Sequence, residues 1–210
     1  MKKTLIKQSA AFILSMLLIS SCAQQPVMLQ LWKSEKKYEA PYNEIMIMAL
    51  VQDLGVRASI EDEFVIEAAR EGLDADISMQ MFPPELGKPM QDMDRTIERL
   101  GKEDYHAIIT ITLFDIESVE YVDSDVAYYP GGYYDQFGNY FYYTYGIVYN
   151  PGYFKRDSEY FIECNMYELK GDKLLWTGRS KVFDHVDFYE HLEEMSEQLF
   201  SEVRAAGFIK

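Results

Sequence analysis

The chain from residue 42 onward alternates between short apolar runs and stretches with helical spacing, and this order limits the folds it can adopt. Ile45–Val51 is a continuous apolar run of strand length, typical of a strand buried on both faces. Apolar residues at helical spacing follow over Ser59–Gly72, with Ser59 as the expected N-cap and Gly72 just past the helix end. Ala75–Met81 predicts a second strand. Strand, helix and strand in succession predict a parallel crossover unit.

The same alternation continues with a second helix predicted over Met93–Leu100 and a long third strand over Ala107–Val119. Further on, Glu159–Leu169 and Leu174–Phe183 are alternating segments joined by a four-residue turn, which predicts a β-hairpin.

The last helix is predicted to follow a cap at Asp184 or Asp187. Its apolar stripe recurs every three or four positions, at Phe188, Leu192, Met195, Leu199 and Val203. The complete pattern predicts one α/β domain over residues 41–210, with three helices on a mixed five-stranded sheet in a three-layer-like arrangement. Its expected order is strand, helix, strand, helix, strand, insertion, strand, strand, helix.

The insertion, residues 120–158, follows neither a helical nor a strand pattern. The stretch Tyr128–Phe154 holds ten tyrosines and three phenylalanines, and Tyr140–Tyr149 is interpreted as an extended arm. Tyrosine supplies a large, rigid contact area with a polar tip and is enriched at interfaces. The candidate binding residues are Tyr133, Tyr134, Tyr140, Tyr142 and Tyr143. The alternative is that the segment folds back and covers one face of the sheet.

The N-terminal residues predict export and a lipid anchor. Lysines precede an apolar stretch, and the run Ile19-Ser20-Ser21-Cys22 ends it, so residues 1–21 are interpreted as a removed signal peptide. The same run resembles the lipobox of bacterial lipoproteins, which implies that the cysteine thiol receives diacylglycerol, with palmitate as an expected acyl chain, and that the chain is cut so that the cysteine becomes the first residue. Residues 22–40 are then expected to be a tether. The absence of an aspartate after Cys22 favours the outer membrane, with the domain facing the periplasm. The alternative is an ordinary signal peptide with a chance cysteine.

The net charge of the chain limits which classes of partner it is expected to bind. The chain has a formal net charge of −15, which disfavours nucleic acid and anionic lipid head groups. The expected membrane link is therefore the lipid on Cys22. The other cysteine, Cys164, lies in an alternating strand and is interpreted as a small core residue.

The sequence predicts no catalytic site, metal site or cofactor. His185 and His191 lie six positions apart on different helix faces, and His106 is interpreted as a surface residue at a strand start. The acids Glu61, Asp62 and Glu63 are interpreted as first-turn residues that favour the helix dipole.

Several local strings resemble envelope lipoproteins of Gram-negative bacteria. They include Ile60-Glu61-Asp62-Glu63-Phe64 and Leu174-Leu175-Trp176-Thr177-Gly178. The order of elements is similar to the soluble domain of lipoprotein activators of penicillin-binding proteins, the curli-secretion lipoprotein and the N-terminal domain of the Tol-system propeller protein. The resemblance covers roughly residues 42–119 and 159–208. It implies a tethered adaptor that binds a protein partner, and it supplies no catalytic residues.

The leading functional hypothesis is therefore a lipid-anchored, non-enzymatic envelope protein that binds a protein partner through its aromatic segment. The alternative is a module that binds a glycan or a peptidoglycan fragment, because aromatic rings pack against sugar rings. An enzyme with paired carboxylates, such as a hydrolase, is the third hypothesis.

Overall fold

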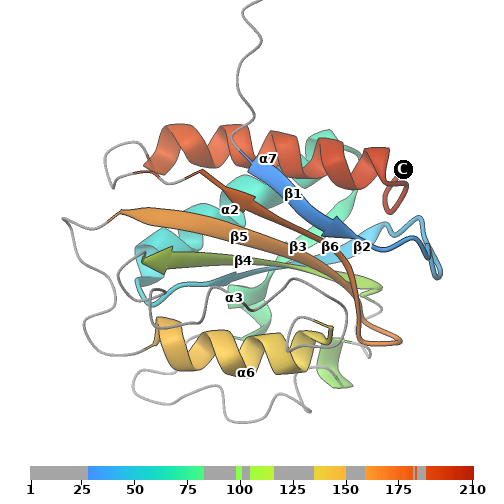
Figure 1. Ribbon diagram of the computed structural model, residues 1–210, viewed down its shortest axis with the longest axis horizontal. Coiled ribbons are helices and arrows are strands. Elements are labelled where there is room, and N and C mark those ends of the chain that lie inside the picture. The colour runs from blue at the N-terminus through green and yellow to red at the C-terminus, as the bar shows by residue number, and fades with distance from the viewer. Residues whose placement is uncertain are drawn as a thin grey trace, which may run out of the picture.

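One mixed six-stranded sheet, with the strand order β1-β6-β5-β4-β2-β3, forms the centre of the domain (Figure 1). The structure is a computed structural model that describes residues 28–82, 98–100, 105–115, 135–149, 159–181, 183 and 188–210. The strands are β1 (Met28–Lys33), β2 (Glu44–Leu50), β3 (Asp74–Ile77), β4 (Ala107–Asp115), β5 (Tyr160–Glu168) and β6 (Lys173–Ser180). The helices in the described residues are α2 (Leu54–Arg70), α3 (Ser78–Met81), α6 (Phe137–Val148) and α7 (Phe188–Ala205), and residues 98–100 are helical as well.

The sheet has a parallel half and an antiparallel half. Strand β2 pairs in parallel with both β3 and β4, as expected of crossover connections. Strand β4 then pairs antiparallel with β5, β5 with β6, and β6 with the edge strand β1. The hairpin turn between β5 and β6 holds Asp172 at φ 49°, a left-handed conformation that Asp and Asn tolerate.

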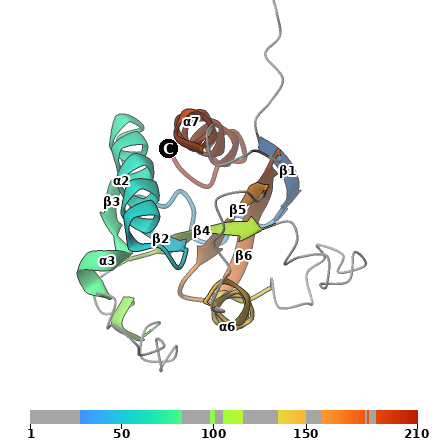
Figure 2. The same cartoon turned by 90° about the vertical axis from the view of Figure 1, so that its left-hand side faces the viewer.

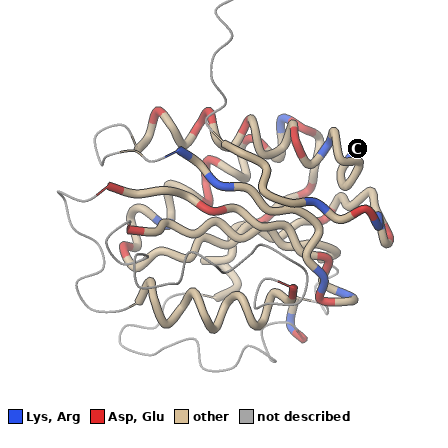
Figure 3. Tube along the Cα trace, viewed as in Figure 1, with Lys and Arg blue, Asp and Glu red and all other residues tan. Residues whose placement is uncertain are grey.

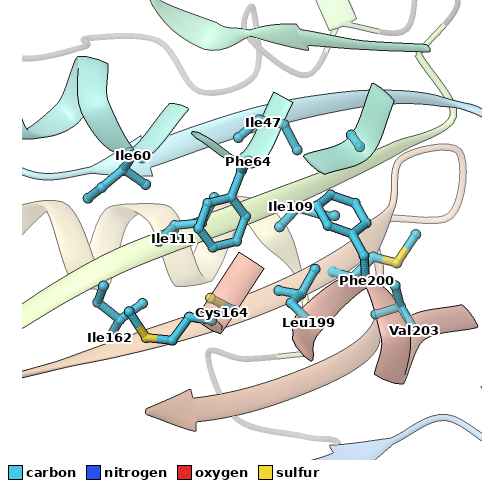
Figure 4. Close-up of a cluster of buried hydrophobic side chains, with 14 of the residues drawn as sticks. Ile47, Ile60, Phe64, Ile109, Ile111, Ile162, Cys164, Leu199, Phe200 and Val203 are labelled. Carbon is cyan, nitrogen blue, oxygen red and sulfur yellow. The ribbon is translucent and has the colours of Figure 1, made fainter. Parts of the chain in front are cut away.

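The helices lie on both faces of the sheet, as the end-on view shows (Figure 2). Helices α2 and α7 cover one face, here called the α7 face, and α6 covers the opposite face, here called the α6 face (Figures 1 and 2). The α7 face holds the larger apolar core, where Phe64 of α2 and Phe200 of α7 meet above Ile109 and Cys164 (Figure 4). The predicted stripe of the last helix is confirmed, because all five of its residues are buried.

The prediction of five strands and three helices is too low in both counts, because β1 is an additional strand and α3 and α6 are additional helices. Residues 28–33, assigned to the tether, form β1 and pair with β6 along the sheet edge. The side-chain amide of Gln198 in α7 accepts from the backbone N–H of Met28 and donates to its carbonyl, so both groups are paired. Met28 itself is buried in the core. The polar residues that follow β1, from Ser34 on, concealed a short apolar strand at the domain's edge.

Several element boundaries also differ from the predictions. Helix α2 starts at Leu54, because Asp53 accepts from the backbone N–H groups of Gly55 and Val56 at 2.8 and 2.9 Å. Ser59 lies inside the helix, and its hydroxyl donates to the carbonyl of Gly55. Gly72 ends the helix as predicted, with φ 76°.

The predicted strand Ala75–Met81 is shorter in the structure, since β3 ends at Ile77 and the short helix α3 follows. The predicted helix Met93–Leu100 lies outside the described residues apart from 98–100. The largest difference is α6, which occupies much of the segment interpreted as an extended arm.

Candidate binding site on the α6 face

The α6 face of the sheet carries two adjacent rows of buried polar side chains. Strand register places Thr110, Asn165 and Thr177 side by side across β4, β5 and β6, here called the Asn165 row. The next row comprises Thr112, Glu163 and Arg179, here called the Glu163 row. Alternate residues of a strand point to the same face, so each strand contributes one residue to each row.

Each side chain of the Glu163 row makes at least one hydrogen bond within the row or to Tyr140, although the Nε atom of Arg179 makes none. Glu163 is fully buried and accepts from the Tyr140 hydroxyl at 3.0 Å and from Arg179 at 2.9 Å. The Tyr140 hydroxyl also lies 2.8 Å from that of Thr112. Arg179 lies over the Phe161 ring at 4.4 Å, and desolvation lowers its pKa to about 10. A buried carboxylate is tolerated here because a guanidinium and a phenol pair with it.

The Asn165 row, by contrast, contains buried oxygen atoms that make no hydrogen bond. The hydroxyls of Thr110 and Thr177 and the Oδ1 atom of Asn165 are buried and make no hydrogen bond within the protein. The same is true of the Tyr167 hydroxyl on β5 and of the Thr144 hydroxyl on α6. A buried polar atom without a partner costs roughly 1–3 kcal/mol, and folded proteins hold few of them. Five such oxygen atoms lie together between α6 and the sheet, so this face holds more unpaired buried polar atoms than a folded domain is expected to have in one place.

Helix α6 is fixed to the sheet at its start and along its inner face. The carboxylate of Asp172, in the β5–β6 turn, accepts from the backbone N–H of Phe137 at 2.7 Å. Burial raises the pKa of Asp172. The inner face of the helix buries Phe137, Tyr140, Phe141, Thr144 and Val148. These side chains pack on apolar residues that flank the polar rows, among them Met46, Met48 and Ile108.

The outer face of α6 carries no charge, and its exposed residues are Asn139, Tyr142 and Gly146. The helix contains no Asp, Glu, Lys or Arg, and it is uncoloured along its length in Figure 3. Tyr142 is 56 % exposed on this face. The partly buried Tyr145 packs against the core under the helix, and its ring stacks on that of Tyr149 with 4.1 Å between centroids. Burial raises the pKa of the Tyr149 hydroxyl.

A second buried polar cluster lies where β2 and β3 end. Glu61 accepts from Ala49 N–H at 3.1 Å, from the Arg57 side chain at 3.0 Å and from the Ser78 hydroxyl at 2.6 Å. Its other oxygen accepts from Met79 N–H at 2.9 Å. These bonds join β2, α2 and α3. The interpretation of Glu61 as a first-turn residue is therefore wrong, because the helix begins seven positions earlier and Glu61 is fully buried.

The predicted binding residues fall into three groups. Cys22, Tyr133 and Tyr134 lie outside the described residues. Tyr140 is fully buried and bonded to the Glu163 row, so it offers no surface, and we remove it from the candidates. Tyr142 is exposed and Tyr143 is half-buried, and their role in binding stays a prediction.

The structure also places Cys164 and His106, two further residues considered from the sequence. Cys164 is buried in the core as expected, and burial raises its pKa. His106 lies 2.7 Å from Glu44 at the surface. Across the described residues, no three His, Cys, Asp or Glu side chains are placed to hold a metal ion. None of the helices in that part of the chain is long and apolar enough to span a membrane.

Sequence reasoning missed the two polar rows. A signal was present, because Thr110 and Thr112, Glu163 and Asn165, and Thr177 and Arg179 each lie two positions apart in apolar strands. Placing the three pairs side by side requires the strand register, which the sequence does not give.

Comparison with known proteins gives distant structural likeness only. No family model and no curated protein matches the chain. Among solved structures, a PelC dodecamer from Paraburkholderia phytofirmans is 7 % identical over 83 % of this chain and 94 % of that one, with a TM-score of 0.42. The lipoprotein GNA1162 from Neisseria meningitidis is 9 % identical over 76 % of this chain and 99 % of that one, with a TM-score of 0.37. The family resemblance stated above therefore stays a prediction.

Proposed function

We propose that this protein is a lipid-anchored, non-catalytic binding protein of the bacterial envelope, and that the outer face of α6 contacts a protein partner. The anchor is the lipid expected on Cys22, in the outer membrane with the domain in the periplasm. The observation that carries the proposal is the uncharged outer face of α6 with its exposed Tyr142.

The exposed side chains of α6 and α7, which cover opposite faces of the sheet, differ in charge. Helix α7 covers the opposite face of the sheet and exposes charged side chains, including Glu190, Glu193 and Glu197. Helix α6 exposes tyrosine, asparagine and glycine instead. Charged residues are depleted and aromatic residues enriched at the centre of protein interfaces. The outer face of α6 has that composition in a chain that is 26 % charged.

Site-specific photo-cross-linking tests the proposal in the intact cell. A benzophenone amino acid replaces Tyr142 in one chain and Tyr189 in a matched control. Tyr189 is 62 % exposed but lies on α7, on the far side of the sheet. The expected result is a discrete adduct with one envelope protein from position 142 only, reduced by excess wild-type protein. No adduct from position 142, or the same adduct from both positions, contradicts the proposal.

The anchor has its own test. Labelled fatty acid should enter the wild-type protein and not a Cys22→Ala variant, and the variant should leave the membrane fraction. A wild-type protein without label contradicts the lipoprotein prediction, whatever the cross-linking shows.

A further inference from the structure

The Asn165 row holds three buried side-chain oxygen atoms that make no hydrogen bond, while the Asn165 amide nitrogen donates to Glu163 at 3.5 Å. Thr110, Asn165 and Thr177 lie side by side on three neighbouring strands, and each is fully buried with an unpaired oxygen atom. Thr144 adds a fourth unpaired oxygen atom from α6, and Tyr167 a fifth from β5. We propose that the Asn165 row is a binding site for a neutral, hydroxyl-rich ligand of the oligosaccharide class, and that α6 moves off the sheet to admit it.

The chemistry of the unpaired atoms identifies the ligand class. The hydroxyls of Thr110 and Thr177 can each donate and accept, whereas Asn165 Oδ1 only accepts. Sugar hydroxyls also donate and accept, so neighbouring hydroxyls of one ring can pair with all three side chains. An apolar ligand would leave these atoms as they are now, buried and unpaired.

The neighbouring row explains why the ligand should be neutral. Glu163 and Arg179 lie beside Asn165 and Thr177, and they pair with each other at 2.9 Å. An anionic ligand would face the buried Glu163 carboxylate, and a cationic ligand would compete with Arg179 for it. A neutral ligand leaves this ion pair intact and avoids the desolvation of a further charge.

Aromatic rings lie at the edges of the Asn165 row. Trp32 of β1 is the cross-strand neighbour of Thr177, and Tyr167 lies two residues from Asn165 on the same face of β5. A sugar ring presents C–H groups on its faces, which pack against aromatic rings while its hydroxyls bond to polar groups. Ligand sites commonly combine aromatic walls with a few placed polar groups.

The position of α6 explains why the site is closed in this structure. The five unpaired oxygen atoms are shielded from solvent while α6 lies over the sheet. The inner face of the helix is linked to the polar rows by the Tyr140 hydroxyl, which bonds to Thr112 and Glu163. Displacing α6 exposes the unpaired atoms to water or ligand, and this gain offsets part of the apolar contact that is lost. The segment is thus suited to open at a low free-energy cost compared with the rest of the core.

Isothermal titration of the full-length protein in detergent micelles tests the proposal, with chitotetraose and maltotetraose as neutral probes. The key variant is Thr110→Val/Thr177→Val, which keeps side-chain shape and removes two of the hydroxyls. Valine removes buried unpaired oxygen atoms, so the melting temperature should not fall, and loss of binding cannot be attributed to unfolding. We expect at least one probe to bind wild type and the double variant to bind it at least tenfold more weakly.

The control is Tyr189→Ala, which removes an exposed tyrosine from α7 on the opposite face of the sheet and should bind the probe as wild type does. A second variant, Tyr142→Ala, tests whether the probe lies on the outer face of α6 instead. The proposal is overturned if neither probe binds wild type or if the double variant binds equally well. It is also overturned if Tyr142→Ala abolishes binding while the double variant retains it, because the ligand would then lie on the outer tyrosine face. None of these outcomes bears on the cross-linking test of the protein partner.

Discussion

Thr110 and Thr112 offer a matched comparison within one strand. Both are fully buried on the α6 face of β4, two positions apart. The Thr112 hydroxyl is 2.8 Å from the Tyr140 hydroxyl, whereas the Thr110 hydroxyl has no hydrogen-bond partner. Valine replaces the hydroxyl by a methyl group of similar size at either position. The same chemical change should therefore have opposite effects on stability.

The magnitudes follow from the state of each hydroxyl. Thr110→Val removes an unpaired buried oxygen atom and should raise the free energy of unfolding by about 1–2 kcal/mol. Thr112→Val removes a hydrogen bond and should lower it by about 0.5–1.5 kcal/mol. The effect at Thr112 stays moderate because the Tyr140 hydroxyl keeps its bond to Glu163. The free energies of unfolding of the two variants should therefore differ by roughly 1.5–3.5 kcal/mol.

Urea denaturation of the full-length protein in detergent micelles measures the difference. With a typical urea dependence of about 1–3 kcal/mol per molar, the two midpoints should differ by on the order of 1 M, with Thr110→Val the more stable. Equal midpoints, or a Thr110→Val variant less stable than wild type, would refute the account of the Asn165 row. The slope should be unchanged, because neither substitution alters the surface exposed on unfolding.

Three further predictions concern the two helices and the turn that holds α6. Leu199→Ala should destabilise the domain by about 2–5 kcal/mol, the range for a fully buried leucine, while the exposed Glu197→Ala should stay within about 0.5 kcal/mol in the same assay. Replacing residues 122–156 by a short Gly-Ser linker removes α6 and uncovers the apolar residues on the α6 face of the sheet. We therefore expect a dye that binds exposed apolar surface to bind this variant, and we expect its melting temperature to fall. An unchanged melting temperature would show that α6 does not complete the core. Burial raises the pKa of Asp172 above its ordinary 3.8. The protonated carboxyl group therefore stabilises the folded state in acid, and this stabilisation is lost as the pH rises through the raised pKa. Asp172→Asn should therefore melt at or above the wild-type temperature at pH 7, and the difference between the two melting temperatures should shrink below pH 4. A variant that is less stable than wild type at pH 7 only would contradict this prediction.

The sequence was most informative where one face of an element is apolar and the other is charged. In α7 the buried residues Leu192 and Leu199 alternate with glutamates such as Glu193 and Glu197, so the stripe and its phase could be predicted. The parallel strand β2 was equally clear, because both of its faces are buried and its sequence is continuously apolar.

The same reasoning failed for α6 because both of its faces are aromatic. The buried positions, such as Tyr140, Phe141 and Thr144, do follow a helical spacing. The exposed Tyr142 and the partly buried Tyr145 obscure this spacing, because a tyrosine counts as apolar whether it is buried or exposed. A surface helix that uses one residue type on both faces has no visible polar side. The prediction of an extended arm was wrong for this reason, and the alternative of a covered sheet face describes residues 137–148.

The central claim is that α6 is a cover over incompletely paired polar rows, and native-state hydrogen exchange tests it most directly. Amides of α6 should exchange through a local opening at a free energy below that of global unfolding, whereas amides of α7 should exchange only by global unfolding. The Thr110→Val/Thr177→Val variant should slow the exchange of α6, because closing the helix over valines leaves fewer unpaired oxygen atoms. If α6 and α7 exchange at the same free energy in wild type, α6 is an ordinary part of the core and the claim is contradicted.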